Sequence, residues 1–255
     1  SVGGGLLCAG AGPRSACSPS IVGVTFSENV AAGSVGRGGA VYNWGSGGGA
    51  SSPQMTNVAF VGNVALSGGA LYNFGSSGVS SPVIVSTTFS KNAASQDGGA
   101  IYNNGSRGTS SPVIVNSVFV GNSTQNGKGG AIYNDGRFSE GESSPVITNT
   151  TFTRNAASSD DGGALYNRGD GGGTSRPLLT NVILWDDFAF SEGREIFNDE
   201  ATPTLRSTIV KGGLDFPGIG NMGGESVIDG GGNQSSDPLF VDADGPDDTI
   251  GTPDD

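Results

Sequence analysis

The stretch GGAIYNNGSRGTSSPVIVNSVFVGN, from Gly98 to Asn122, decides the fold because close copies of it fill much of the chain. Its first block, GGAIYN, contains two glycines, a small residue, an aliphatic residue, an aromatic residue and Asn. Five such blocks end in a Tyr-Asn pair: Tyr42 and Asn43, Tyr72 and Asn73, Tyr102 and Asn103, Tyr133 and Asn134, Tyr166 and Asn167. The tyrosines are spaced by 30, 30, 31 and 33 residues. A decayed copy, REIFN, ends at Asn198, and a leading copy, GGGLLC, ends at Cys8.

A second block keeps step with the first. Its copies read SSPQMTNVAFVGN, SSPVIVSTTFSKN, SSPVIVNSVFVGN and SSPVITNTTFTRN, and the last is SRPLLTNVILWDD. Self-similarity with a period of a few tens of residues is typical of repeat architectures. The sequence therefore predicts a chain of stacked, nearly identical units.

Each unit is predicted to be extended rather than helical. Gly and Pro punctuate every unit, and short runs rich in Val, Ile, Thr, Tyr and Phe lie between them. About 30 residues at roughly 3.3 Å per residue give a path of up to about 100 Å, which suits one turn of a coil with three sides. Stacking such turns about 4.8 Å apart pairs each strand with its own copy in the next unit. The expected fold is a parallel β-helix.

Two columns of the second block are always large and apolar, so both are predicted to point inward. The first of them contains Met55, Ile84, Ile114, Ile147 and Leu179, and the second contains Phe60, Phe89, Phe119, Phe152 and Leu184. They lie five positions apart, whereas strand side chains alternate with a period of two. The chain must therefore bend between them, at Asn57, Ser86, Asn116, Asn149 and Asn181, where Asn is able to stack on its copies.

The facing of the first block is inferred from its decayed copy. The small residue there is replaced by Glu195, and a charge at this position suggests that the alanine column faces outward. By alternation, the tyrosines then lean outward as an aromatic stripe, and the asparagines turn inward. These repeated residues are predicted to form structural ladders rather than reactive groups.

Composition narrows the function. The 255 residues include 47 glycines and no histidine, which excludes a Ser-His-Asp hydrolase. Residues 1–135 hold three acids and five bases, a net of +2, and residues 136–255 hold 21 acids and seven bases, a net of −14, which together give −12. A nucleic-acid partner needs a basic face and is not expected. No stretch approaches the roughly 20 apolar residues that span a bilayer.

Cys8 and Cys17 are expected to form a disulfide, which implies an oxidising compartment. The alternative is two free thiols in a reducing cell. A metal site on the cysteines is not expected, because two thiolates without histidine make a poor ligand set.

The GGA(I/L)YN and SSPxIxNxxFxxN blocks resemble secreted bacterial right-handed parallel β-helix proteins of the pectate-lyase-like superfamily. They also resemble the repeats of polymorphic outer-membrane autotransporter passengers. The resemblance covers roughly residues 3–210, and the segment from Ser236 to Asp255 is similar to a C-terminal signature of such surface proteins. It implies an all-β, single-stranded, right-handed solenoid of about seven turns of 30–33 residues, with three strands per turn. We expect one domain, with repeats at 1–210 and an irregular turn and acidic tail at 211–255.

Charged residues offer few candidates for chemistry. Asp242, Asp244, Asp247 and Asp248 space their oxygens as Ca²⁺ loops do, although the full twelve-residue pattern is missing. Asp97, Asp160 and Asp161 precede the glycine pairs, and Asp186, Asp187 and Glu192 fall where the repeat decays. A glycosidase needs two carboxylates about 5–10 Å apart. The simpler interpretation of all these groups is solvated turn charge, and likewise for the tripeptide Arg168-Gly169-Asp170.

The sequence favours a non-catalytic structural or adhesive rod, secreted or attached to a cell surface. The charge asymmetry between its halves suggests end-to-end stacking of copies into filaments. Two alternatives remain open: a polysaccharide lyase or glycoside hydrolase on the same fold, and a glycan-binding module that uses the tyrosine stripe. Fold alone does not decide among them.

Overall fold

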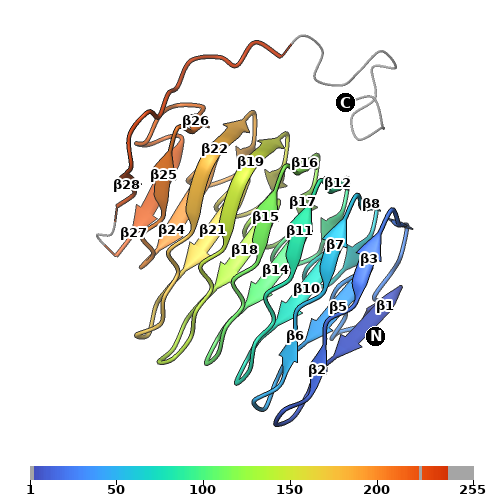
Figure 1. Cartoon of the computed structure of the whole chain (residues 1–255). Helices are drawn as coiled ribbons and strands as arrows, with labels where there is room; N and C mark the ends of the chain where they lie inside the picture. The colour runs from blue at the N-terminus through green and yellow to red at the C-terminus, as the bar shows by residue number, and fades with distance from the viewer. Residues whose placement is uncertain (1–2, 224–225, 241–255) are drawn as a thin grey trace.

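The computed structural model describes residues 3–223 and 226–240, which form an all-β parallel solenoid of about six turns, close to the seven predicted (Figure 1). The first face is an eight-stranded parallel sheet built mostly from the GGAxYN blocks. Its strands, in spatial order, are β1 (Leu6–Ala9), β5 (Val41–Trp44), β10 (Leu71–Phe74), β14 (Ile101–Asn104), β18 (Ile132–Asp135), β21 (Leu165–Arg168), β24 (Ile196–Asp199) and β27 (Ile219–Met222).

The second and third faces come from the two halves of the second block. The second face holds β3 (Ser20–Val22), β7 (Gln54–Thr56), β11 (Val83–Val85), β15 (Val113–Val115), the first halves of β19 (Val146–Thr153) and β22 (Leu178–Trp185), β25 (Thr204–Arg206) and β28 (Ile228–Asp229). The third face holds β4 (Thr25–Ser27), β8 (Ala59–Val61), β12 (Thr88–Ser90), β16 (Val118–Val120), the second halves of β19 and β22, and β26 (Ile209–Val210).

Two smaller sheets complete the coils. Two-residue strands pair along the axis between the third face and the glycine turn: β9 (Val64–Ala65), β13 (Ala93–Ala94), β17 (Ser123–Thr124), β20 (Ala156–Ala157) and β23 (Phe188–Ala189). Near the N-terminus, β2 (Ala16–Cys17) pairs with β6 (Ala50–Ser51). The pairing is in register throughout, so that Tyr72 lies beside Tyr102 and Phe89 beside Phe119. Parallel pairing continues beyond residue 210, because β27 pairs with β24 and β28 with β25.

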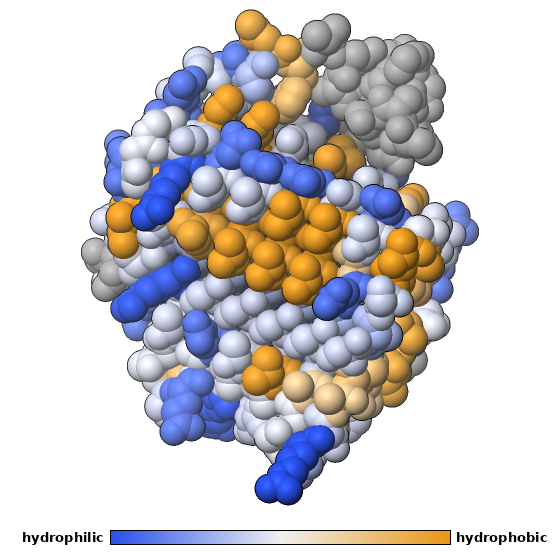
Figure 2. Space-filling model, in the orientation of Figure 1, coloured by the Kyte–Doolittle hydropathy of each residue, from blue (hydrophilic) through white to orange (hydrophobic). Residues whose placement is uncertain are grey.

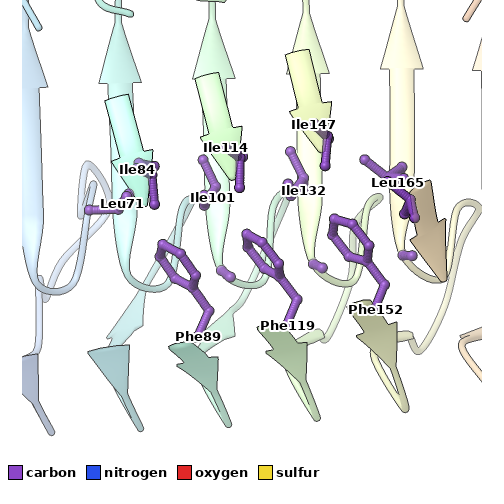
Figure 3. Packing of buried hydrophobic residues seen from close by; sticks show 14 of the residues in the cluster. Leu71, Ile84, Phe89, Ile101, Ile114, Phe119, Ile132, Ile147, Phe152 and Leu165 are labelled. Carbon is purple, nitrogen blue, oxygen red and sulfur yellow. The ribbon is translucent and has the colours of Figure 1, made fainter. Parts of the chain in front are cut away.

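The core is a stack of similar layers, in which the first and second faces each contribute an aliphatic residue and the third face contributes a phenylalanine in most coils (Figure 3). Phe26, Phe60, Phe89, Phe119 and Phe152 form a column of parallel rings whose centroids are 5.1, 4.8, 4.5 and 4.7 Å apart. Both columns that the sequence placed inside, at Ile84 and Phe89 in one coil, are fully buried. Offset stacking at this spacing suits aromatic rings, so like residues pack on like along the axis.

The bend between these two columns uses left-handed backbone. Asn57, Ser86, Asn116, Asn149 and Asn181 have φ between 50° and 53°. This confirms the predicted corner and explains the preference for Asn, which tolerates this conformation better than most residues. On the outside of the corner, Asn149 donates from Nδ2 to Oδ1 of Asn116 at 3.0 Å, and Asn181 donates to Asn149 at 2.8 Å.

The predicted facing of the alanine column is wrong. Ala40, Ala70, Ala100, Ala131 and Ala164 are all fully buried within the main core. Alternation holds only within a strand, and each strand begins at the aliphatic residue that follows the alanine. The first glycine of each pair is in the left-handed region, as at Gly98 with φ 69°, so the chain turns just before the alanine.

The tyrosines do lie outside the main core, in a separate cluster, but they are not an exposed stripe. Their side chains are only 0–6% exposed. Neighbouring rings and the charged columns described below cover them. The predicted open aromatic surface is therefore corrected to a buried aromatic band.

Candidate functional site

Two ladders of buried asparagines run along the solenoid axis. In the first, Nδ2 of each asparagine donates to Oδ1 of its copy in the next coil at 2.8–2.9 Å, through Asn43, Asn73, Asn103, Asn134, Asn167, Asn198 and Asn221. Cys8 occupies this position in the first described coil, and Asn43 Oδ1 is left without a donor. The ladder contains the asparagines that the sequence singled out as structural.

The second ladder belongs to the FxxN end of the repeat and was not predicted. It runs through Asn29, Asn63, Asn92, Asn122 and Asn155 and ends on Asp187. Each inner member also donates its other Nδ2 hydrogen to the phenylalanine carbonyl of the previous coil, as Asn122 does to Phe89 at 2.9 Å. Its Oδ1 accepts from both the side chain and the backbone N–H of the previous member. Four hydrogen bonds thus satisfy one buried amide, as burial requires.

Several tyrosine hydroxyls bond to the residue that follows the ladder asparagine in the next coil. Tyr72 accepts from Asn104 at 3.0 Å, and Tyr102 donates to Asp135 at 3.0 Å. Tyr166 donates to Asp199 at 3.0 Å. Arg137 forms a salt bridge with Asp135 at 2.9 Å, which compensates the fully buried carboxylate.

Cations cover the other side of this aromatic band. Arg37 lies over the Tyr72 ring at 5.1 Å, and Lys128 lies over the Tyr166 ring at 4.5 Å and donates to the Tyr166 hydroxyl at 2.9 Å. Burial raises the pKa of all five tyrosines, that of Tyr72 to about 12. The band is a sealed, mutually hydrogen-bonded spine and offers no open aromatic platform.

The predicted acids near the glycine turns lie close to Lys128. Asp97 accepts from the backbone N–H of Lys128 at 3.0 Å. The ammonium of Lys128 lies 3.8 Å from Asp160 and 3.9 Å from Asp161. Burial raises the pKa of Asp97 and of Asp161. These groups form part of the cover over the tyrosines.

The Arg-Gly-Asp tripeptide is engaged internally. Arg168 Nη2 contacts Asp170 Oδ2 at 2.7 Å, and Arg168 Nε lies 3.5 Å from Asp199. Cys8 and Cys17 are joined by a disulfide that closes the loop of the first coil. The four aspartates predicted to bind Ca²⁺, Asp242, Asp244, Asp247 and Asp248, lie outside the described residues.

Asp187 and Glu195 form a pair of carboxyl groups in the interior, and sequence reasoning missed it. Asp187 replaces the asparagine of the second ladder, and Glu195 replaces the core alanine, in the same coil. Their side chains are 5% and 1% exposed. Each has one oxygen without a donor, Asp187 Oδ2 and Glu195 Oε2. The sequence did contain a signal for this pair. In one coil, Asp187 replaces the Asn of one column and Glu195 replaces the Ala of another, and both columns are otherwise uniform.

Burial raises the pKa of both carboxyl groups, and the proximity of Asp187 raises that of Glu195 further. Asp187 Oδ1 accepts from the backbone N–H and Nδ2 of Asn155 at 2.7 and 2.8 Å, whereas Asp187 Oδ2 and Glu195 Oε2 receive no donor. Asp186, which the sequence grouped with Asp187 and Glu192, forms an exposed salt bridge with Lys211. Glu192 donates its backbone N–H to Asp161.

The second face presents an aliphatic surface, seen in Figure 2 as an orange field. Outward-facing residues of β11, β15, β19 and β22 form it: Val83, Val85, Val113, Val115, Val146 and Leu178. Val83 and Val146 are 37% and 38% exposed, and the others are half-buried. Threonines take the same column in neighbouring coils, at Thr56, Thr148 and Thr180. We call this set of valines and Leu178 the aliphatic face.

The fold and its ladders define a parallel β-helix repeat protein. The repeats match the Chlamydia polymorphic membrane protein repeat at residues 86–104, 116–135 and 149–168. Each matched segment runs from the bend after the aliphatic column to the strand of the next tyrosine block, so the matched residues are those that build the ladders. The expected resemblance to polymorphic membrane protein passengers is confirmed, and it fits a surface-type β-helix. Comparison with curated proteins and with solved structures gave no match.

Two further observations concern only the described part of the chain. Residues 3–223 and 226–240 contain no helix of the length and apolarity that crossing a bilayer requires. Within the same residues, no three His, Cys, Asp or Glu side chains are grouped so as to hold a metal ion.

Proposed function

We propose that this chain is a rigid, non-catalytic segment of a secreted or surface-attached protein, which holds a contact face away from its attachment point. The observation that carries the proposal is that the repeated polar groups form hydrogen bonds with one another inside the rod. The asparagines of both ladders bond to their own copies, and the charged groups around the tyrosines bond to the spine. The repetition therefore stabilises length and straightness, which a spacer requires.

The aliphatic face supports an adhesive role for this rod. It is flat, uncharged and continuous over several coils, and contiguous exposed apolar surface commonly marks a contact site. The fit of the repeats to a surface-type β-helix agrees with this role. The buried Asp187–Glu195 pair is closed to a polymer, so it does not favour the enzyme alternative.

The first experiment compares the native chain with Val113→Lys/Val115→Lys in retention on phenyl-coated beads. Lys at these outward positions interrupts the apolar field without entering the core, so weaker retention is expected. Val113→Thr/Val115→Thr is the matched control, because threonine already occupies this column. Equal retention of the native chain and the Lys variant would contradict the adhesive role of this face.

A second experiment addresses the enzyme alternative. The native chain is incubated with a panel of neutral and acidic polysaccharides, and new reducing ends and unsaturated products are measured. We expect binding at most, without turnover. Turnover that survives extensive purification would replace the structural role with catalysis.

End-to-end assembly is a further part of the proposal, supported by the charge difference between residues 1–135 and 136–255. Negative-stain electron microscopy with and without Ca²⁺ tests it, together with the Ca²⁺ prediction for the C-terminal aspartates. Thin filaments support stacking. Discrete short rods under both conditions contradict it.

A further inference from the structure

The C-terminal end of the second asparagine ladder differs from the rest of the molecule. In every earlier rung, a neutral amide donates onward to the next coil. At Asp187 the donor is lost, and the following coil offers no replacement: Val210 pairs with Leu184, which places Gly213 at the position equivalent to Asp187. In the same way, Ile219 pairs with Ile196, which places Gly218 opposite Glu195. The carboxyl pair therefore lies directly beneath that coil.

Residues 211–218 lie over the pair, between Val210 and Ile219, which are buried in the main core. Lys211 forms a salt bridge with Asp186 and lies over the Trp185 ring at 5.2 Å. Leu214 packs against the main core from a partly buried position. Among the described residues, the charged groups that act on the pair are Asp186 and Lys211, which form a salt bridge with each other. Lys211 favours ionisation of Glu195, and Asp186 opposes it.

Two ionised carboxylates cannot share this dry site. Asp187 is anchored by Asn155, and each carboxyl group has an oxygen that no donor reaches, so a proton is the smallest group that satisfies both oxygens. Loss of that proton would place two like charges together beneath the overlying coil. The simplest relief is separation of that coil, which would let water reach both groups.

We propose that Asp187 and Glu195 form a proton-binding pair that couples the packing of the overlying coil, residues 204–222, to pH. With the proton bound, the coil is closed over the core. As the pH rises, the closed coil becomes less stable relative to its open form. A surface rod with this device loosens around residues 204–222 under alkaline conditions and remains intact elsewhere.

The sign follows from proton counting. Burial raises the pKa of both carboxyl groups above their unfolded values, which lie near about 4. Above that pH the folded pair holds more protons than the open chain, so stability falls as pH rises. Each extra proton raises the unfolding equilibrium constant about tenfold per pH unit.

The chain has two tryptophans, so the unfolding of the first coils and of the later coils can be followed separately by fluorescence. Trp44→Phe leaves Trp185, two residues from Asp187, as the reporter of the later coils. Trp185→Phe leaves Trp44, in β5, as the reporter of the first coils. Urea unfolding of both single-tryptophan proteins is followed by fluorescence between about pH 5 and about pH 9. A falling midpoint is expected for Trp185, with a clearly shallower dependence for Trp44.

Glu195→Gln, in the Trp44→Phe background, is the decisive variant. The introduced glutamine amide donates to Asp187 without a titrating proton, so the Trp185 midpoint should lose most of its pH dependence. Asp97 and Asp161 also have raised pKa values and contribute to the pH dependence of stability. The readout is therefore the difference in the pH dependence of the urea midpoint between the Trp44→Phe protein and the same protein with Glu195→Gln. An unchanged slope in the Glu195→Gln protein would overturn the proposal.

Two further measurements keep the test decisive if the Glu195→Gln substitution disturbs packing. Asp187→Asn/Glu195→Ala restores the repeat residues at both positions, so it should fold and be more stable than native at the alkaline end. Infrared difference spectroscopy should show a protonated carboxyl band in the native chain near neutral pH, absent from Glu195→Gln. If Ca²⁺ raises the native midpoint but not that of Glu195→Gln, the pair binds a cation instead of a proton, which also overturns the proposal.

Discussion

The hydroxyl of Tyr166 donates to Oδ2 of Asp199, 3.0 Å away in the next coil, and accepts from Lys128, whose ammonium also lies over the Tyr166 ring. One side chain thereby joins three consecutive coils. The relationship shows why the tyrosine column is buried although it lies outside the main core. Neighbouring coils supply partners for the hydroxyl, and the ring stacks between its copies 5.1 and 5.2 Å away.

The tyrosines should resist ionisation. Burial raises their pKa values, that of Tyr72 to about 12, so the folded state holds phenolic protons that the unfolded chain loses near about pH 10. Stability should fall as pH rises above that value. In an absorbance titration, none of the five tyrosines should ionise at the usual pH while the chain stays folded. Normal titration of folded protein would contradict the buried spine.

Removing an inner rung of the second ladder should be costly. Asn122→Ala removes the acceptor of one Asn92 Nδ2 hydrogen and of the Asn92 backbone N–H, and it removes the side-chain donor to the Phe89 carbonyl. Each unsatisfied buried group costs about 1–3 kcal/mol, so we expect a loss of at least about 3 kcal/mol in the free energy of unfolding. Urea unfolding measures it. Asn126→Ala, at an exposed turn position, is the control and should change stability by no more than about 0.5 kcal/mol.

The corner after the aliphatic column should distinguish residues mainly by backbone conformation, since the one side-chain hydrogen bond of Asn116 is exposed. Asn116 has φ 51° and an exposed side chain. Asn116→Gly should be nearly neutral, and Asn116→Val should cost about 1–2 kcal/mol, because a β-branched residue is strained in the left-handed region. Thermal unfolding of the two variants provides the measurement. Equal melting temperatures would show that the corner adapts to its side chain.

The disulfide should stabilise the first coil specifically. Cys8 and Cys17 take the places of a ladder asparagine and of Ser51, so Cys8→Asn/Cys17→Ser restores the repeat residues. Losing a cross-link over nine residues costs about 2–3 kcal/mol in the loop-entropy description. The asparagine amide introduced at position 8 would supply the donor that Asn43 Oδ1 lacks, and return about 1 kcal/mol.

Trp44 reports this change in urea unfolding with and without a thiol reductant. Reductant should lower the native midpoint at Trp44 and leave that of the double variant unchanged. If the native protein does not respond to reductant, the cross-link contributes nothing to the first coil.

The repeat, its period and its aliphatic and phenylalanine columns specified a parallel β-helix from sequence alone. Stacking forces each column to meet its own copies, so one-dimensional repetition becomes three-dimensional contact without any long-range choice. The corner at Asn116 could be predicted for the same reason, since two inward columns five residues apart require a bend. The ladder from Asn43 to Asn167 followed from alternation within a single strand.

Only the tertiary structure decided which side chains next to the glycine turn point into the core and which point outward. The sequence could not show that Glu195 points inward, because its environment includes the buried Asp187, eight residues earlier, whose side chain lies in the same coil. Nor could it show that the tyrosines are covered, because Lys128 and Asp199 approach Tyr166 from the coils on either side. Repetition fixes which residues stack, whereas the three-dimensional neighbours of a charge decide whether it is buried.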